Sequence, residues 1–259
     1  MAAGMLLWGW GPAVIRTLFQ GQEIPTSHLF QLFPDTAIEV EGFINDSGKN
    51  GPVLVVVAGI HGNEPAGVHA AESLREWIPT YGTLVVIPRA NGPAVEAGMR
   101  HTPDMQDLNR AFPGKDPGTR TQKLAGKIIQ TVLELEPALV LDLHESFGRY
   151  GTAPLALGQS LIANMPDQQA GFLLELTEAV NRTTALEHPF TWTGPPLSGT
   201  LAQALEKEGI PAVTVETDME LPRDLRVEMH REVVLESMAL LEMTCLETPC
   251  ELSLTERRE

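Results

Sequence analysis

The chain has 259 residues, of which 43% are hydrophobic and 20% are charged, and its formal net charge at pH 7 is −16. Such a composition is typical of a globular protein with one sizeable core. We therefore expect one domain over residues 1–259, with an N-terminal segment at 1–36 and a polar tail at 244–259. The negative charge argues against nucleic acid or an anionic membrane surface as a partner.

The chain has two cysteines, Cys245 and Cys250. They are too few for a disulfide framework, which favours a reducing, cytoplasmic compartment. Residues 1–15 are largely apolar but contain glycine and proline, and they lack the basic residues that precede the apolar core of a signal peptide. They are also too short to span a bilayer. We interpret them as an N-terminal strand or an appended segment, with export as the alternative.

Hydrophobic periodicity and turn residues predict strands that alternate with helices. The expected strands are 37–43, 53–58, 83–88, 138–144 and 211–216, with short ones at 153–157 and 190–193, and the expected helices are 65–77, 119–134, 168–181, 198–208 and 224–243. Residues 89–117 have no clear period, so we expect a long loop, which in a compact domain is usually functional. This alternation predicts an α/β fold: a three-layer α/β/α sandwich around a mixed, largely parallel sheet.

Residues able to do chemistry stand at or just after the ends of three apolar strands. His61 and Glu64 follow the first, and His144 and Glu216 end two others. The carboxyl ends of parallel strands share one edge of a sheet, so these side chains could converge. His61, Glu64 and His144 form the donor set that binds zinc with one position open for water. Glu216 is then a candidate base. The alternatives are helix caps for the first pair, and an N-cap or a surface carboxylate for Glu216.

Asp142 lies two residues before His144, on the same side of the expected strand. It is either a partner that orients the imidazole of His144 or a polar residue at a strand end.

Four segments together resemble a known family. They are His61-Gly-Asn-Glu64, Asp107-Leu-Asn109-Arg110-Ala-Phe-Pro-Gly114, Asp142-Leu-His144 and Val215-Glu216-Thr217. In this order they are similar to the zinc carboxypeptidase superfamily, and most of all to its succinylglutamate desuccinylase/aspartoacylase branch. The resemblance covers residues 53 to 217, which is most of the expected domain.

The resemblance implies a role for each motif residue. One zinc ion would be bound by His61, Glu64 and His144, and Glu216 would be the general base. Asp107 would hold the ring of His61 in one orientation.

It also implies how substrate is bound. Asn109 and Arg110 would hold a substrate carboxylate, a task that suits the planar guanidinium. Arg100 would polarise the scissile carbonyl and stabilise the oxyanion. Without the resemblance, both arginines would be interpreted as solvated loop residues. The segments 158–160, 198–202 and 221–231 also resemble the branch. In the last we expect Arg226, Glu228, His230 and Arg231 to form an exposed or interface-lining helix face.

The sequence departs from the branch in two respects. Aspartoacylases and succinylglutamate desuccinylases carry an additional C-terminal β-rich domain, whereas we expect only a helix and a polar tail after Glu216. Many peptidases of the superfamily use a mobile tyrosine shortly before the base. The tyrosines here are Tyr81 and Tyr150, and neither stands at that place.

We expect a zinc-dependent hydrolase that cleaves an amide bond beside a free carboxylate. The first hypothesis is an N-acyl amino acid deacylase, and the second is a metallocarboxypeptidase acting on short or cell-wall peptides. A third, from another class, is a catalytically silent protein that binds metal or ligand. A serine hydrolase is less well supported because no Gly-x-Ser-x-Gly segment occurs. The expected partner is a small carboxylate-bearing substrate, with a homo-oligomer as an open alternative.

Overall fold

The computed structural model describes residues 24–164, 167–183 and 187–243. Its strands are β1 (Thr26–Leu32), β2 (Val40–Asp46), β3 (Val53–Ala58), β4 (Thr83–Ile87), β5 (Leu139–Ser146), β6 (Ser160–Ile162), β7 (Thr191–Thr193) and β8 (Ala212–Asp218). Its helices are α2 (Pro65–Ser73), α3 (Gly92–Ala97), α4 (Arg120–Glu134), α5 (Asp167–Asn181), α6 (Leu201–Lys207) and α7 (Arg223–Leu240), with a 3₁₀ turn, η1, at Leu108–Arg110.

The strands form one mixed sheet in the order β1-β2-β4-β3-β5-β8-β6-β7. Its centre is parallel, because β3 pairs in parallel with β4 and β5, and β5 with β8. The antiparallel pair β1 and β2 extends one side, and β6 joins the other side antiparallel to β8. The central strands are therefore the ones whose carboxyl ends meet at one edge.

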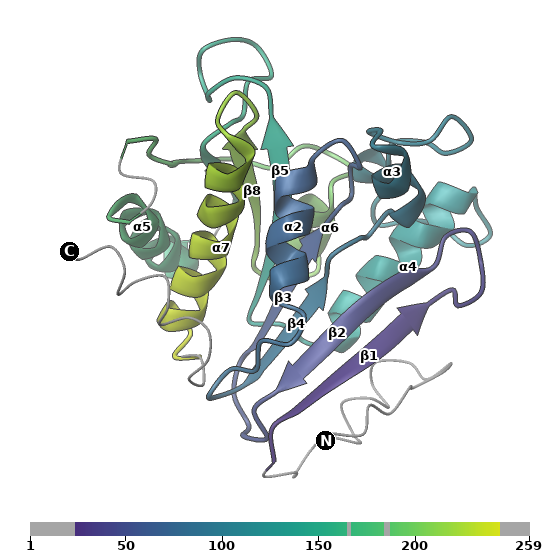
Figure 1. The fold of residues 1–259 in the computed structure, drawn as a ribbon, viewed down its shortest axis with the longest axis horizontal. Helices are drawn as coiled ribbons and strands as arrows, with labels where there is room; N and C mark the ends of the chain where they lie inside the picture. The colour runs from purple at the N-terminus through teal and green to yellow at the C-terminus, as the bar shows by residue number, and fades with distance from the viewer. Residues whose placement is uncertain (1–23, 165–166, 184–186, 244–259) are drawn as a thin grey trace.

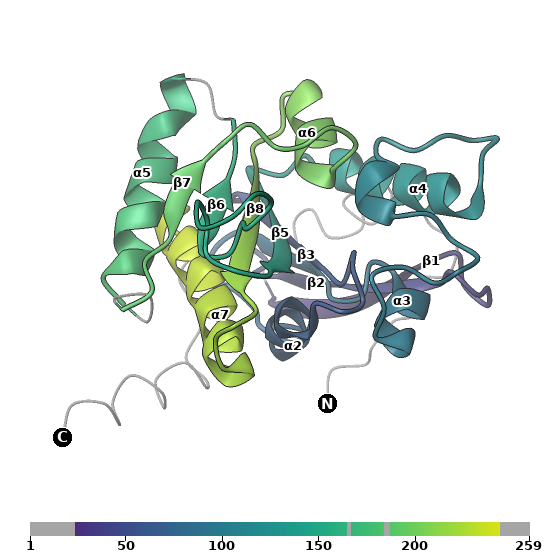
Figure 2. The same cartoon turned by 90° about the horizontal axis from the view of Figure 1, so that it is seen from above.

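Helices cover both faces of this sheet (Figures 1 and 2). Helices α2, α5 and α7 pack on one face, and α4 and α6 lie on the other. Each interface is filled by its own cluster of buried apolar side chains. The protein thus has the expected three-layer α/β/α architecture with a mixed sheet that is parallel at its centre.

Local sequence explains the central elements. Strand β3 is an unbroken apolar run because helices cover it on both faces, and its residues from Leu54 to Ala58 are fully buried. Helix α4 begins with a reciprocal capping box, in which the Thr119 and Gln122 side chains each accept from the other residue's backbone N–H.

The structure differs from expectation in the segment 89–117. It contains α3 and η1 and is not one irregular loop. Pro93 stands in the first turn of α3, where its missing N–H is harmless, and Gly98 ends the helix in a left-handed conformation with φ of 60°. Six helical residues are too few to show a clear hydrophobic period, so the pattern gave no signal.

Three strand expectations also need correction. The strand expected at 153–157 does not form; Pro154 interrupts it, Leu155 has φ of 67°, and the pairing strand is β6 instead. Strand β2 starts at Val40, three residues later than expected, and β1 forms at Thr26–Leu32, inside the N-terminal segment 1–36, where we expected no strand at these residues. Helix α2 ends at Ser73, short of the expected residue 77.

Residues 1–15, Cys245 and Cys250 lie outside the described residues. In the described part of the chain, no helix is both long and apolar enough to cross a membrane.

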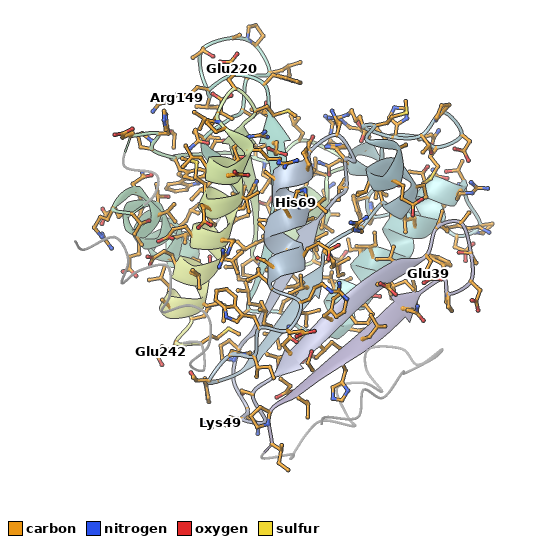
Figure 3. All side chains as sticks on the ribbon, in the orientation of Figure 1. Glu39, Lys49, His69, Arg149, Glu220 and Glu242 are labelled. Carbon is orange, nitrogen blue, oxygen red and sulfur yellow. The ribbon has the colours of Figure 1, made fainter. Side chains whose placement is uncertain are left out.

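The candidate site lies at the carboxyl edge of the central strands. Figure 3 shows Arg149 and Glu220 in the loops that extend beyond the ends of β5 and β8, while Lys49, in the β2–β3 turn, lies at the opposite end of the molecule. Strands β5 and β8 are in register so that His144 stands beside Glu216. Two of the expected site residues are therefore neighbours on adjacent strands.

Candidate functional site

The three expected metal ligands gather at one point. His61 and Glu64 lie in the turn between β3 and α2, and His144 lies near the end of β5. Nδ1 of His61 is 2.7 Å from Glu64 Oε1, and Nδ1 of His144 is 2.8 Å from Glu64 Oε2. All three residues are buried, and their ligand atoms lie within 4.8 Å of one another. Two imidazole nitrogens and a carboxylate oxygen arranged in this way fit a single metal ion.

Glu64 does not act as a helix cap. It occupies the N-cap position of α2, yet its side chain makes no capping hydrogen bond. Its Oε2 instead accepts a hydrogen bond of 3.0 Å from the backbone N–H of Glu145 on β5. Burial alone would raise the pKa of this carboxyl, but the contacts with His144 and His61 lower it to about 2. Glu64 is therefore a carboxylate directed at the two histidines.

The turn that carries His61 depends on a glycine. A Cβ atom on Gly62 would lie 1.8 Å from the carbonyl oxygen of Ala94 in α3, so no larger residue fits without movement of the backbone. The N–H of Gly62 also donates to the carbonyl of Met99, at 2.9 Å. This close approach fixes His61 and Glu64 against the segment that leads to Arg100.

The second ring nitrogen of His61 faces a carboxylate. Its Nε2 is 3.1 Å from Asp107 Oδ1, and Asp107 Oδ2 accepts hydrogen bonds from Arg100 at 2.8 and 3.0 Å. Burial opposes ionisation, but His61 and Arg100 hold the pKa of Asp107 well below its usual range. A charged acceptor at Nε2 keeps the ring oriented with Nδ1 toward Glu64.

The second ring nitrogen of His144 faces two side chains. Asp142 Oδ1 lies 3.2 Å from His144 Nε2, and Asn109 Nδ2 lies 3.3 Å from the same atom. Burial would lower the pKa of His144, but Asp142 and Glu64 raise it well above its ordinary value. The Asn109 side chain is also held at its other end, because its Oδ1 accepts from Leu201 N at 3.3 Å.

Glu216 is a buried carboxyl without a partner at one oxygen. The residue is 8% exposed, and its Oε2 makes no hydrogen bond. Burial raises its pKa to about 8, and the nearby negative charges of Glu64 and Asp142 add to the effect. An unpaired carboxyl facing a pocket is the kind of group that exchanges protons with a bound molecule.

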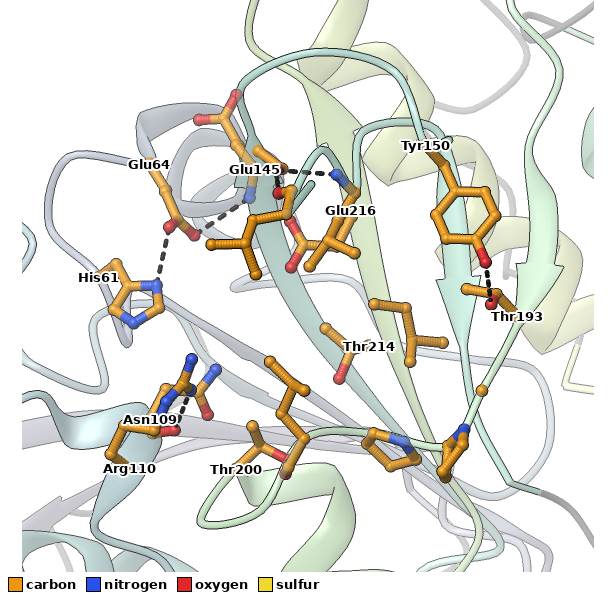
Figure 4. Close-up of a pocket in the computed structure, with 18 of the residues that line it drawn as sticks. His61, Glu64, Asn109, Arg110, Glu145, Tyr150, Thr193, Thr200, Thr214 and Glu216 are labelled. Carbon is orange, nitrogen blue, oxygen red and sulfur yellow. Dashed lines mark hydrogen bonds and ion pairs between the residues drawn. The ribbon is translucent and has the colours of Figure 1, made fainter. Parts of the chain in front are cut away.

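These groups open into one pocket of about 400 Å³ (Figure 4). His61, Glu64 and Glu216 line it together with both expected substrate arginines, Arg100 and Arg110. The Nη1 atom of Arg110 donates to the carbonyl of Asn109 at 2.6 Å, and the residue is otherwise exposed. The structure thus brings every expected site residue into the pocket wall or into contact with a residue that lines it.

Sequence reasoning missed a buried ion pair beside the site. Glu145 Oε2 accepts from the backbone N–H of Ala66 at 2.7 Å, and its Oε1 accepts from Arg226 Nη1. The expectation of an exposed helix face at 226–231 is therefore wrong for Arg226 and also for His230, which is fully buried. The signals that pointed here were the position of Glu145 next to His144 and the resemblance of 221–231 to the branch.

Tyr150 lines the pocket, although its place in the sequence does not match that of the mobile tyrosine in peptidases of the superfamily. Thr193 Oγ1 donates to its hydroxyl at 2.8 Å (Figure 4). No periodic pattern links the β5–β6 loop to β7, so this pair needed the folded chain to be found.

A family model for the succinylglutamate desuccinylase/aspartoacylase catalytic domain matches residues 50–226. The chain belongs to this family, which agrees with the resemblance found in its motifs.

One curated relative is N-alpha-acetyl-L-2,4-diaminobutyric acid deacetylase of Halomonas elongata, 32% identical over 115 residues, which are 43% of this chain and 33% of that protein. Among solved structures, product-bound Csd4, a cell shape determinant of Helicobacter pylori, has a TM-score of 0.70 at 20% identity, covering 77% of this chain and 53% of Csd4. The product-bound ectoine utilization protein EutE (DoeB) of Ruegeria pomeroyi has a TM-score of 0.65 at 20% identity, covering 87% of this chain and 69% of that protein.

The chain therefore matches about a third of the length of the curated deacetylase and about half of Csd4. The two structural similarities establish the shared fold.

Proposed function

We propose that the protein is a zinc-dependent hydrolase that cleaves an amide bond beside a free carboxylate, and first of all an N-acyl amino acid deacylase. One observation carries the proposal: ligand atoms of His61, Glu64 and His144 lie within 4.8 Å of one another, with Nδ1 of each histidine 2.7–2.8 Å from the Glu64 carboxylate, beside a pocket that Glu216 lines. The family membership and the similarity to a deacetylase support it.

The residues present fit one zinc ion, held by His61, Glu64 and His144. Bound in this donor set, zinc lowers the pKa of a water to about 7 and polarises a carbonyl. Asp107 and Asp142 each lie close to an outer ring nitrogen, Nε2, where they would accept its N–H and leave Nδ1 of each imidazole directed at the ion.

The chain's own residues account for binding and proton transfer. Arg110 pairs with the substrate carboxylate through its guanidinium, while Asn109 supports that segment through its bond to Leu201. Arg100 lies 3.8 Å from Glu64 and lines the pocket, where it stabilises negative charge that develops on the carbonyl oxygen.

Glu216 is the base. It accepts a proton from the attacking water as the water oxygen bonds to the carbonyl carbon. It then delivers that proton to the amine nitrogen as the carbon–nitrogen bond breaks. The products are a carboxylic acid and an amino acid, so atoms and charges balance without a further reactant.

A peptide substrate is the second candidate. Arg110 and Asn109, which we call the carboxylate clamp, would also accept the C-terminus of a peptide. Leu155 and Leu197 at the pocket are 82% and 49% exposed, which leaves apolar surface for a longer substrate. A structure of Csd4, described as a D,L-carboxypeptidase, shares the fold with a TM-score of 0.67 at 21% identity over 76% of this chain and 52% of that one. Hydrolysis of N-acyl amino acids and of short peptides, compared with and without chelator, separates the two.

The test of the mechanism is Glu216→Gln, with Glu220→Gln as the matched control. Glu220 is an exposed residue in the loop after β8 and does not line the pocket. We expect Glu216→Gln to keep its zinc and to lose about 10²- to 10⁴-fold in kcat, and the control to stay at the wild-type rate. Full zinc-dependent turnover by Glu216→Gln would refute the mechanism. A zinc-loaded wild type that hydrolyses neither substrate class would favour the catalytically silent alternative.

A further inference from the structure

The pocket has two chemically different parts. Around the candidate metal centre its wall is charged. The rest of the wall carries no ionisable acid or base apart from the phenol of Tyr150; it consists of Ser146, Tyr150, Leu155, Leu157, Ile162, Thr193, Gly194, Pro195, Pro196, Leu197, Thr200 and Thr214. We call this part the neutral recess. Two of its lining residues, Ile162 and Thr214, are buried. Thr193 pairs with Tyr150 at the end away from His61 and Glu64 (Figure 4).

The neutral recess adjoins the carboxylate clamp rather than the opposite side of the metal centre. Residues 194–197 and Thr200 form one wall of the recess, and their chain neighbours Gly199 and Leu201 are hydrogen bonded to the segment 109–112. Phe112 N donates to Gly199 O at 3.1 Å, and Leu201 N donates to Asn109 Oδ1 at 3.3 Å. A molecule whose carboxylate is held by Arg110 would therefore place its adjoining side chain in the recess.

Two of the charged residues that line the pocket are held in ion pairs with other side chains. Arg100 is paired with Asp107, and Glu145 with Arg226. Arg110 is left for one carboxylate. Arg149 lies in the loop above β5 and is not among the lining residues (Figure 3). Among the described residues of the pocket wall, a second substrate carboxylate would have no free cation. An ammonium group would find no free carboxylate except that of Glu216, because Glu64 faces the two histidines and Glu145 is paired with Arg226.

We propose that the neutral recess binds the side chain of the carboxylate-bearing residue and selects neutral, mainly apolar side chains such as those of leucine and methionine. This inference rests on the proposed function and narrows its substrate class. Burial of apolar groups should raise kcat/KM for such substrates by about fourfold for each methylene that the recess buries. Burial of an unpaired charge disfavours aspartate and diaminobutyrate much more strongly.

The first experiment needs no variant. Zinc-loaded protein is assayed with N-acetyl-L-leucine, N-acetyl-L-alanine, N-acetyl-L-aspartate and N-alpha-acetyl-L-2,4-diaminobutyrate. We expect kcat/KM for leucine to exceed that for alanine by about tenfold or more, and to exceed those for the two charged substrates by at least about 100-fold. A preference for either charged substrate over leucine would overturn the inference.

The second experiment places a cation in the recess. Thr193→Arg should raise kcat/KM for N-acetylaspartate relative to N-acetylleucine by about tenfold or more, because the new guanidinium pairs with the second carboxylate. The matched control is Thr191→Arg, since Thr191 is exposed on the same strand and does not line the pocket. If the ratio of kcat/KM for N-acetylaspartate to that for N-acetylleucine were equal in the two variants, Thr193 would not contact the substrate side chain, and the inference would be contradicted.

A binding measurement separates failure of this inference from failure of the proposed function. Zinc-loaded Glu216→Gln is titrated with the same four compounds by calorimetry. Tightest binding of the leucine compound without turnover by the wild type would leave the recess assignment standing and refute the deacylase proposal. Turnover by the wild type, together with tightest binding of a charged compound, would refute the recess assignment and leave the deacylase proposal standing.

Discussion

The buried pair of Arg226 and Glu145 gives the sharpest prediction about how the site is held. Glu145 stands on β5 immediately after His144. Its carboxylate accepts hydrogen bonds from the backbone N–H of Ala66, in the first turn of α2, and from the guanidinium of Arg226 on α7. Arg226 Nε also donates to Leu221 O at 3.0 Å, in the connection that follows β8. The pair therefore joins three elements that carry or adjoin site residues. We take Arg226→Met as the perturbation, because methionine keeps much of the apolar volume and removes the charge.

The expected cost follows from burial. The Glu145 side chain is 0% exposed and that of Arg226 is 10% exposed, so the variant leaves a buried carboxylate without its cation. Loss of one partner of such a pair costs about 3–5 kcal/mol. The matched control is Arg231→Met, on the same helix and facing Glu228 at 3.4 Å, with side chains 29% and 38% exposed. A surface pair of that kind contributes about 0–1 kcal/mol.

The assay is urea denaturation of the metal-free variants, with the free energy of unfolding taken from the midpoint and slope. The double variant Arg226→Met, Glu145→Gln should recover part of the loss, because the amide oxygen still accepts from Ala66 N and no charge remains buried. A loss of unfolding free energy in Arg226→Met no larger than that in Arg231→Met would contradict this prediction. So would a loss in the double variant as large as the sum of those in Arg226→Met and Glu145→Gln.

Two further predictions concern the site. Asp107→Asn should weaken zinc binding by about 10- to 100-fold in a chelator competition, because a neutral amide holds His61 Nε2 less firmly; unchanged affinity would contradict this. His230 is fully buried, and burial lowers its pKa from 6.5 to about 3, so only the unfolded chain protonates it between these values. Its contribution to stability is therefore complete above pH 6.5 and declines by about 1.4 kcal/mol per pH unit as the pH falls toward 3. His230→Gln should therefore show a smaller change in denaturation midpoint between pH 7 and 5 than the wild type. Equal changes in midpoint for the variant and the wild type would contradict this prediction.

Much of the fold could be predicted from hydrophobic pattern alone. Strand β3 has the bounds expected from its valine run, and α4 begins beside the expected Thr119, because burial on both faces and a capping box leave clear local signals. The gathering of His61, Glu64 and His144 could be predicted too, since parallel strands bring their carboxyl ends to one edge.

What escaped prediction depends on contacts between distant segments. Glu145 and Arg226 are 81 positions apart, and nothing local to either shows that both are buried. Besides Ser146 of β5 and Thr214 of β8, the neutral recess is assembled from the β5–β6 loop, β6, β7 and the segment before α6, and each of these four contributes only a few residues without a period. Positive φ at Leu155 and the short strand β6 likewise follow from tertiary packing rather than from propensity.

Everything proposed for the site depends on one zinc ion bound by His61, Glu64 and His144. Metal analysis of the purified protein after zinc loading and dialysis tests it most directly, with His144→Ala compared against His69→Ala. His69 is exposed on α2 and takes no part in the cluster, so its removal is a matched control (Figure 3). We predict about one equivalent of zinc in the wild type and in His69→Ala, and a small fraction of that in His144→Ala. Less than roughly half an equivalent in the wild type, or equal zinc in the two variants, would contradict the account.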